Sequence, residues 1–263
     1  MIDEEVKEQV YNKYQDIFDF VYHLIETGFD NFKGRPLTNL PETVTLFHHV
    51  KATNLIDSIS ILCVFGYGRE ALIQVRTLFN LFINIKWLTD EEHESRMTKF
   101  AEFEVVNRKS KLDAFNKFGL SPQQPNKITD WIHQSEFDRV KKKYSLERPR
   151  DFYNWSGKSI WGMARDLKLE GDYDLVYGPL SELEHTSPAS VRGYLDDSEE
   201  GVIQLRVGPK DEDIELALLT CLQYYLPVKK IAYSTFDFSL EVLEKNYQEL
   251  HSLDAKYGNL TKQ

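Results

Sequence analysis

Apolar residues recur at three- and four-residue spacing along most of the chain, which is the pattern of helices that bury one face. Glycine and proline residues interrupt the pattern at intervals, as in the loop GRPLTNLPET. The segments predicted to be helical are, in order, 3–30, 43–65, 66–90, 91–117, 126–145, 159–169, 173–185 and 211–250. The fold class predicted from this pattern is an all-α multi-helix bundle.

Two features modify the helical pattern toward the end of the chain. The stretches GYL and VIQLRV, separated by DDSEEG, predict a small β hairpin near 193–207. Pro227 lacks a backbone N–H, so we expect it to kink or break the helical segment 211–250. No linker separates two apolar cores and no long repeat is visible, so we predict one helical domain over residues 1–263.

The helix predicted over 66–90 carries polar groups where a core is expected. Arg69, Arg76, Asn80 and Trp87 share one stripe of this helix at about 100° per residue. A helix that is apolar nearly all round is normally buried, and a buried guanidinium is costly unless a partner meets it. The helix therefore needs acceptors from another segment, or it borders a polar pocket.

The segment 177–192 is the densest supply of polar groups in an otherwise apolar context. His185 stands where a helix should end, Ser181 lies one turn before it, and Glu182 and Glu184 are close in sequence. Histidine titrates near neutral pH and can act as an acid, a base or a ligand. The alternative is a histidine that the helix dipole favours at a C-terminus. We expect folding to bring this segment to the polar stripe of 66–90.

Composition narrows the classes of partner. The formal net charge of −10 argues against general duplex DNA binding, because Lys and Arg must neutralise phosphates there, whereas RNA and a second copy of the chain stay open as partners. The only basic triplet is Lys141 to Lys143, which we interpret as a solvated helix end rather than a basic groove. No apolar run is long enough to span a bilayer and no signal peptide is visible, so we expect a cytoplasmic protein without membrane contact.

The motifs of cofactor and metal chemistry are weak or missing, so we expect no cofactor and no metal. The adjacent His48 and His49 point about 100° apart on a helix and cannot chelate one ion as an i, i+4 pair would. Glu182-Leu-Glu-His185 has the spacing of di-iron bundles, but those need a second copy of the motif. The GKS of residues 157–159 lacks the earlier glycine of a phosphate loop.

Three stretches in order, GREALIQVRTLFNLFINIKWL, WSGKSIWGMARDLKL and YDLVYGPLSELEHTSPAS, resemble the bacterial family known as domain of unknown function 5677. The resemblance covers roughly residues 45–235 and implies a helical fold and a shared pocket, but no established reaction. Asn80 stands where the family usually has Glu, which implies that an acidic partner of Arg76 is missing. The residues that fit the family's pattern are Arg76, Tyr177, Ser181, His185 and Ser187.

A looser resemblance is to the HEPN helical ribonucleases of toxin and phage-defence systems. These cut RNA with an Arg followed by a His four to six residues later, whereas His185 and Arg192 stand here in the reverse order. The predicted function is accordingly a binding or regulatory domain, in bacterial defence or stress, and the alternative is a metal-independent ribonuclease. In either case Arg69 and Arg76 are the predicted anion-binding groups, Asn80 the polar orienter and His185 the acid or base.

Overall fold

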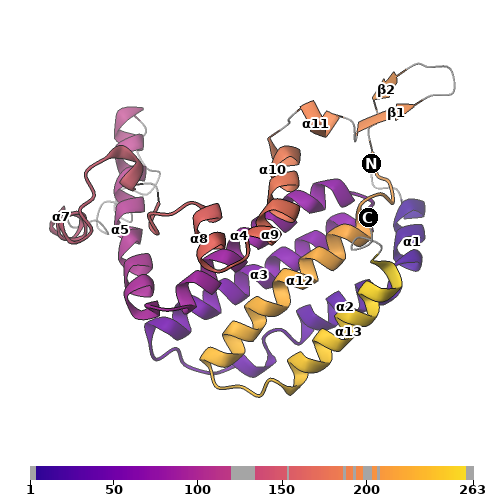
Figure 1. Ribbon diagram of the computed structural model, residues 1–263, viewed down its shortest axis with the longest axis horizontal. Helices are drawn as coiled ribbons and strands as arrows, with labels where there is room; N and C mark the ends of the chain where they lie inside the picture. Colours follow the sequence, from indigo (N-terminus) through magenta and orange to yellow (C-terminus); the bar gives the residue numbers. More distant parts are fainter. Residues whose placement is uncertain are drawn as a thin grey trace. The chain divides into compact units, whose positions relative to one another are not determined.

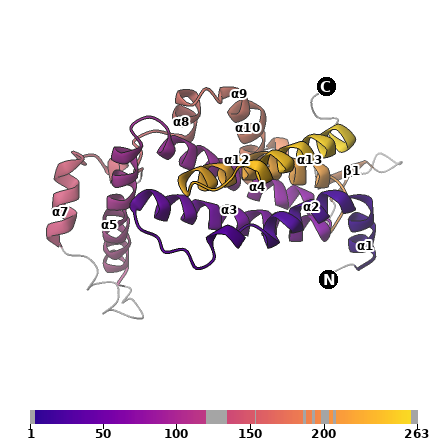
Figure 2. The ribbon, with the colours of Figure 1, turned by 90° about the horizontal axis from the view of Figure 1, so that it is seen from below.

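Two long helices that lie far apart in sequence pack side by side at the centre of the larger part of the fold, α3 (Leu40–Val64) and α12 (Ile214–Thr235) (Figures 1 and 2). Both expose almost none of the apolar side chains on their facing sides; Ile56, Ile59 and Tyr225 are fully buried. The computed structural model describes residues 4–119, 134–152, 154–185, 188–191, 194–197, 203–205 and 208–258.

The chain divides into two units, Met1–Lys86 with Ala164–Gln263 (unit 1) and Trp87–Met163 (unit 2). The remaining helices of unit 1 are α1 (Glu4–Lys13), α2 (Gln15–Glu26), η1 (Asp30–Phe32), α4 (Gly68–Thr89, to residue 86), α8 (Ile160–Asp166, from residue 164), α9 (Glu170–Asp172), η3 (Tyr173–Tyr177), α10 (Gly178–Glu184), α11 (Pro188–Val191) and α13 (Glu241–Tyr257). Unit 2 contains α5 (His93–Lys117), α7 (Gln134–Lys143) and η2 (Pro149–Phe152).

The prediction of an all-α fold is confirmed. Within the range 193–207, two three-residue strands, β1 (Leu195–Asp197) and β2 (Ile203–Leu205), pair antiparallel with Leu195 opposite Leu205. Each unit has buried apolar residues of its own, but nothing in this division tests whether either unit folds alone, so the single domain stays a prediction.

Two predicted boundaries were wrong. The segment 3–30 forms two helices, because the backbone leaves the helical conformation at Tyr14, whose buried ring packs 5.9 Å from that of Tyr257. Of the kink or break predicted at Pro227, the break is wrong: α12 runs through Pro227 to Thr235, and the segment 211–250 is interrupted at residues 236–240 instead. The carbonyl that loses its helical donor belongs to the exposed Gln223, where water can replace the missing N–H.

A close backbone approach joins the start of α4 to the start of α12. Gly66 has a φ of +80°, and its carbonyl accepts a hydrogen bond of 2.8 Å from the amide of Lys210. A Cβ on Gly68 would lie 2.8 Å from the carbonyl carbon of Asp213 and closer still to the carbonyl oxygen of Glu212. Only glycine allows the two chains to pass this closely.

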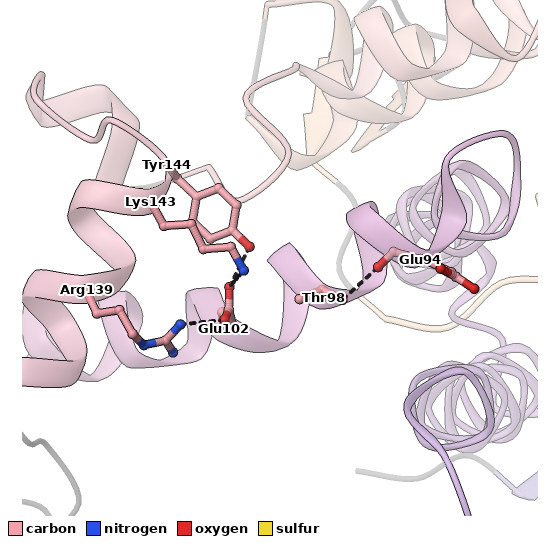
Figure 3. Close-up of polar contacts among 6 residues, drawn as sticks. All are labelled: Glu94, Thr98, Glu102, Arg139, Lys143 and Tyr144. Carbon is pink, nitrogen blue, oxygen red and sulfur yellow. Dashed lines mark hydrogen bonds and ion pairs between the residues drawn. The ribbon is translucent and has the colours of Figure 1, made fainter.

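In unit 2, a single carboxylate ties α5 to α7. Glu102 on α5 accepts hydrogen bonds from Arg139 (2.8 Å) and Lys143 (2.7 Å) and from the hydroxyl of Tyr144 (Figure 3). Burial raises the pKa of Glu102, but the hydrogen bonds from Lys143, Tyr144 and Arg139 outweigh this effect and hold it at about 2. Lys143, the last lysine of the basic triplet, thus helps to link α7 to α5.

Between α3 and α12 the core encloses two polar groups that lack a full set of partners. Lys229 is fully buried, and its ammonium has no hydrogen-bond partner among the described residues; it lies 5.5 Å from the centre of the Tyr233 ring. His49 bonds through Nε2 to the carbonyl of Gly28 (2.8 Å), whereas its Nδ1 is unpaired within the same described part. Burial lowers the pKa of Lys229 to about 8, although Asp30 acts in the opposite direction.

Replacing Gly68 by alanine should destabilise the chain, because the new methyl group would meet the backbone of residues 212–214, which has no side-chain freedom to yield. We expect a loss of about 2 kcal/mol in the free energy of unfolding. Gly171→Ala is the matched control, since no heavy atom lies within 4 Å of the added Cβ in this helical glycine. It should be neutral or stabilise by up to about 1 kcal/mol. Equal urea midpoints for the two variants would contradict the close approach.

Lys229→Met should stabilise the chain at neutral pH. The pKa of Lys229 is about 8 in the folded chain, below its ordinary 10.5. Burial of the charged amine therefore lowers the free energy of unfolding by its full amount below pH 8, and this loss disappears as pH rises toward 10.5. The variant should therefore gain up to about 3 kcal/mol over the wild type at pH 7, and much less near pH 10. Urea unfolding at both pH values measures this.

The neighbouring Lys230→Met is the control for Lys229→Met, because Lys230 is exposed on the same helix. It should leave the free energy of unfolding nearly unchanged at either pH. A Lys229→Met variant that is less stable than the wild type at pH 7 would mean that the ammonium has a partner in solution.

Candidate functional site

Arg76 is the centre of the polar contacts on α4. Its Nη2 donates a hydrogen bond of 2.7 Å to the hydroxyl of Tyr177, and its Nη1 forms an ion pair with the carboxylate of Glu184. The guanidinium also lies 4.6 Å from the centre of the Tyr177 ring, within range of a cation–π attraction. The side chain is 13% exposed. The charge of this mostly buried arginine is therefore neutralised by a segment about 100 residues away.

The geometry of η3 aims Tyr177 at α4. Residues Tyr173–Tyr177 form one π-helical turn between α9 and α10, so that 170–184 is a continuous helical segment with one wide turn. Pro179 cannot donate to the ladder, and a wide turn next to it accommodates the missing bond. The rings of Tyr173 and Tyr177 stack with centroids 4.6 Å apart. The segment is held further by Tyr224 of α12, whose hydroxyl donates to Asp172 at 3.3 Å.

Glu184 links Arg76 to His185. Its Oε2 contacts Nη1 of Arg76 and lies 3.6 Å from Nε2 of His185. The structure thus places Arg76 and His185 at the same carboxylate, and their role as one functional site stays a prediction. His185 itself is the C-cap of α10, donates its backbone N–H to the carbonyl of Ser181 at 3.1 Å, and exposes 68% of its side chain.

The acidic partner of Arg76 is Glu184, a residue that is not among the site residues predicted from the sequence. Asn80 suggested that no carboxylate was available, but Glu184 supplies one from another helix. The signal was present: Glu182 and Glu184 both flank the predicted site residues Ser181 and His185. Glu182 has the spacing of a metal ligand, and both glutamates belong to the segment predicted to supply the polar stripe of 66–90, but the pattern does not assign either one to Arg76.

The other residues predicted for the site do not surround Arg76 as a group. The amide oxygen of Asn80 is buried without a hydrogen-bond partner among the described residues, and its backbone carbonyl accepts from Asn84 at 2.7 Å, so that oxygen does not orient Arg76. Nε of Arg76 is likewise buried and unpaired within that part of the chain. Ser181 contributes its carbonyl to the helix end. Ser187 lies outside the described residues.

Arg69 belongs to a different place, two turns nearer the start of α4. It forms an ion pair of 3.2 Å with Asp213 and lies 5.5 Å from the centre of the Tyr194 ring, whose hydroxyl donates to Glu70 at 3.3 Å. These groups border a pocket of about 320 Å³. Its lining residues are Gly66, Tyr67, Gly68, Arg69, Glu70, Tyr194, Gly208, Lys210, Glu212 and Asp213. We call this the Arg69 pocket.

The two places differ in what they can do chemically. The terminal nitrogens of Arg76 are engaged by a carboxylate and a phenol, so the guanidinium serves as a fastener between α4 and α10. The Arg69 pocket has open volume, cations and carboxylates together. Among the described residues no group of three or more His, Cys, Asp or Glu side chains could hold a metal ion. None of the described helices combines the length and apolar character of a membrane span.

Comparison with known proteins identifies the family. The chain matches the model of the family of unknown function DUF5677 over residues 42–202, which is more than half of its length and includes α4 and the segment from α9 to α10. Neither a curated protein nor a solved structure matches the chain. The matched segment carries Arg69, Arg76, Tyr177 and Glu184, and the chain belongs to the family of unknown function DUF5677.

Proposed function

We propose that the chain is a ligand-binding protein, with a binding or regulatory role rather than a catalytic one, and that its ligand enters the Arg69 pocket. The ligand class is a small polar molecule that bears a carboxylate or phosphate together with amino or hydroxyl groups. The observation that carries this proposal is the pocket itself, which three residues with positive φ surround: Gly66 (+80°), Gly208 (+115°) and Asp213 (+62°).

Backbone strain at a pocket supports a binding role. Asp213 is not a glycine, and its left-handed conformation costs of order 1 kcal/mol, which contacts of the surrounding structure must offset. Here Arg69 holds its carboxylate from across the pocket at 3.2 Å. Strained residues that are held by their neighbours occur mainly at ligand and switch sites. The volume of about 320 Å³ is at the lower end of small-molecule sites.

Charge defines the ligand class. Arg69 pairs with Asp213 at 3.2 Å and Lys210 lies 3.7 Å from Glu212, so an anionic group of the ligand would share these two cations with the carboxylates of the pocket. The N-terminal ends of α4 and α12, each 22 residues long, add a positive potential at the same place. Glu70 and Glu212 line the same pocket and can accept hydrogen bonds from amino or hydroxyl groups of a ligand. A purely anionic or purely apolar ligand would leave part of this lining unmatched.

Arg69→Gln should weaken binding of such ligands by about tenfold or more, because a charge-assisted hydrogen bond is lost. We would titrate the folded protein by calorimetry with inorganic phosphate, amino acids, hydroxy acids and phosphate monoesters. Lys141→Gln, which removes an exposed positive charge from unit 2, is the matched control and should bind as the wild type does. If no ligand of these classes binds, or if Arg69→Gln binds equally well, the Arg69 pocket is not the binding site.

The alternative, a metal-independent ribonuclease, makes a different prediction. The exposed His185 has the chemistry of an acid or base, but Arg76 would have to leave both Glu184 and Tyr177 to stabilise a phosphorane. We therefore expect purified protein to leave total RNA intact, and His185→Ala to behave as the wild type does. RNA cleavage that disappears in His185→Ala, with an unchanged melting temperature, would establish the alternative.

A further inference from the structure

The outer face of α3, which does not pack on the core, carries several exposed apolar side chains. Phe47 is 52% exposed, Val50 38% and Ile61 49%. Single exposed apolar residues are ordinary, but these three fall on one side of one helix. The polar residues between them, Asn54 and Asp57, are exposed as well.

The spacing of these residues is that of a helix-packing stripe. Positions 47, 50, 54, 57 and 61 alternate steps of three and four, which keeps them on one side of a helix over 14 residues, or about 21 Å. Asn54 is the middle of the stripe. Phe47 and Ile61 stand seven residues before and after it, and Lys51 and Asp57 stand three residues before and after it, with opposite charges.

We propose that this stripe of α3 is a self-association surface, on which a second copy of the chain packs its own α3 in the antiparallel direction. A two-fold axis at Asn54 sets Phe47 of each copy at the level of Ile61 of the other. The same axis sets Lys51 of each copy at the level of Asp57 of the other. Phe47 is thus matched with Ile61, and Lys51 with Asp57, in both halves of the interface, whereas Val50 lies at the level of the small Ser58.

The charges select the direction of pairing. In a parallel pair, Lys51 would lie at the level of the other Lys51, and Asp57 at the level of the other Asp57. Like charges brought together repel, so this arrangement is disfavoured. The central Asn54 can pair with its own copy and fixes the register, as a lone asparagine does in helical dimers. The occupant that fits the stripe is therefore a second copy of this chain.

The stripe is short, so the dimer should be weak and should appear only as protein concentration rises. Sedimentation velocity over a concentration series measures it. Phe47→Glu and Ile61→Glu should each shift the chain to monomer, because a carboxylate would be set against an apolar side chain. Val242→Glu is the matched control: Val242 is 47% exposed on α13, and its replacement should leave the association unchanged.

Exchanging the charges of Lys51 and Asp57 distinguishes this antiparallel pairing from non-specific association. Lys51→Asp and Asp57→Lys should each weaken association by about tenfold, because each creates like-charge neighbours across the axis. The double variant, which carries both changes, should restore it. Melting temperatures confirm that the variants fold. A wild-type chain that stays monomeric at every concentration, or a double variant that is weaker than both single variants, overturns the proposal.

Discussion

The fold depends on how a buried helix satisfies its own arginines. α4 is apolar nearly all round, yet Arg69 and Arg76 stand two turns apart on one face of it. A buried guanidinium without an acceptor costs several kcal/mol, so two later segments of the chain must come back to α4. The start of α12 meets Arg69 with Asp213, and the segment from η3 to α10 meets Arg76 with Tyr177 and Glu184. These ion pairs tie both segments to α4, in addition to the apolar packing of α12 on α3.

The two arginines of α4 have different surroundings. Around Arg76 the acceptors close over the guanidinium, and the aromatic rings of Tyr173, Tyr177 and Phe79 fill the remaining space. Around Arg69 the close approach of glycine backbones prevents side chains from filling the corner, and a pocket of about 320 Å³ remains. Where the packing of the corner is set by backbone and not by side chains, volume is left for a ligand.

Much of the fold could be predicted from periodicity, because the spacing of apolar residues in a long amphipathic segment identifies it as a helix and gives its approximate ends. The need of α4 for a distant acceptor could also be predicted, since it follows from burial alone. The identity of that acceptor could not be predicted, because Glu182 and Glu184 lie two residues apart on one short helix and the sequence pattern does not give the side of that helix that faces Arg76. Lys229 was equally hidden, because it precedes the exposed Lys230 and the pair looks like an ordinary charged surface.

The distribution of charge bears on which anion this fold can hold. Unit 2 has 14 basic and 12 acidic residues, which leaves unit 1 with a formal net charge of −12. At physiological salt, exposed charges more than about 8 Å apart are largely screened from each other. A small ligand in the Arg69 pocket would therefore sense mainly the charges that line it, which are Arg69 and Lys210, the carboxylates of Glu70, Glu212 and Asp213, and the adjacent helix ends. A polynucleotide extends over many such lengths and meets the acidic surface of unit 1 along its course, so local attraction at one arginine would be offset by repulsion elsewhere.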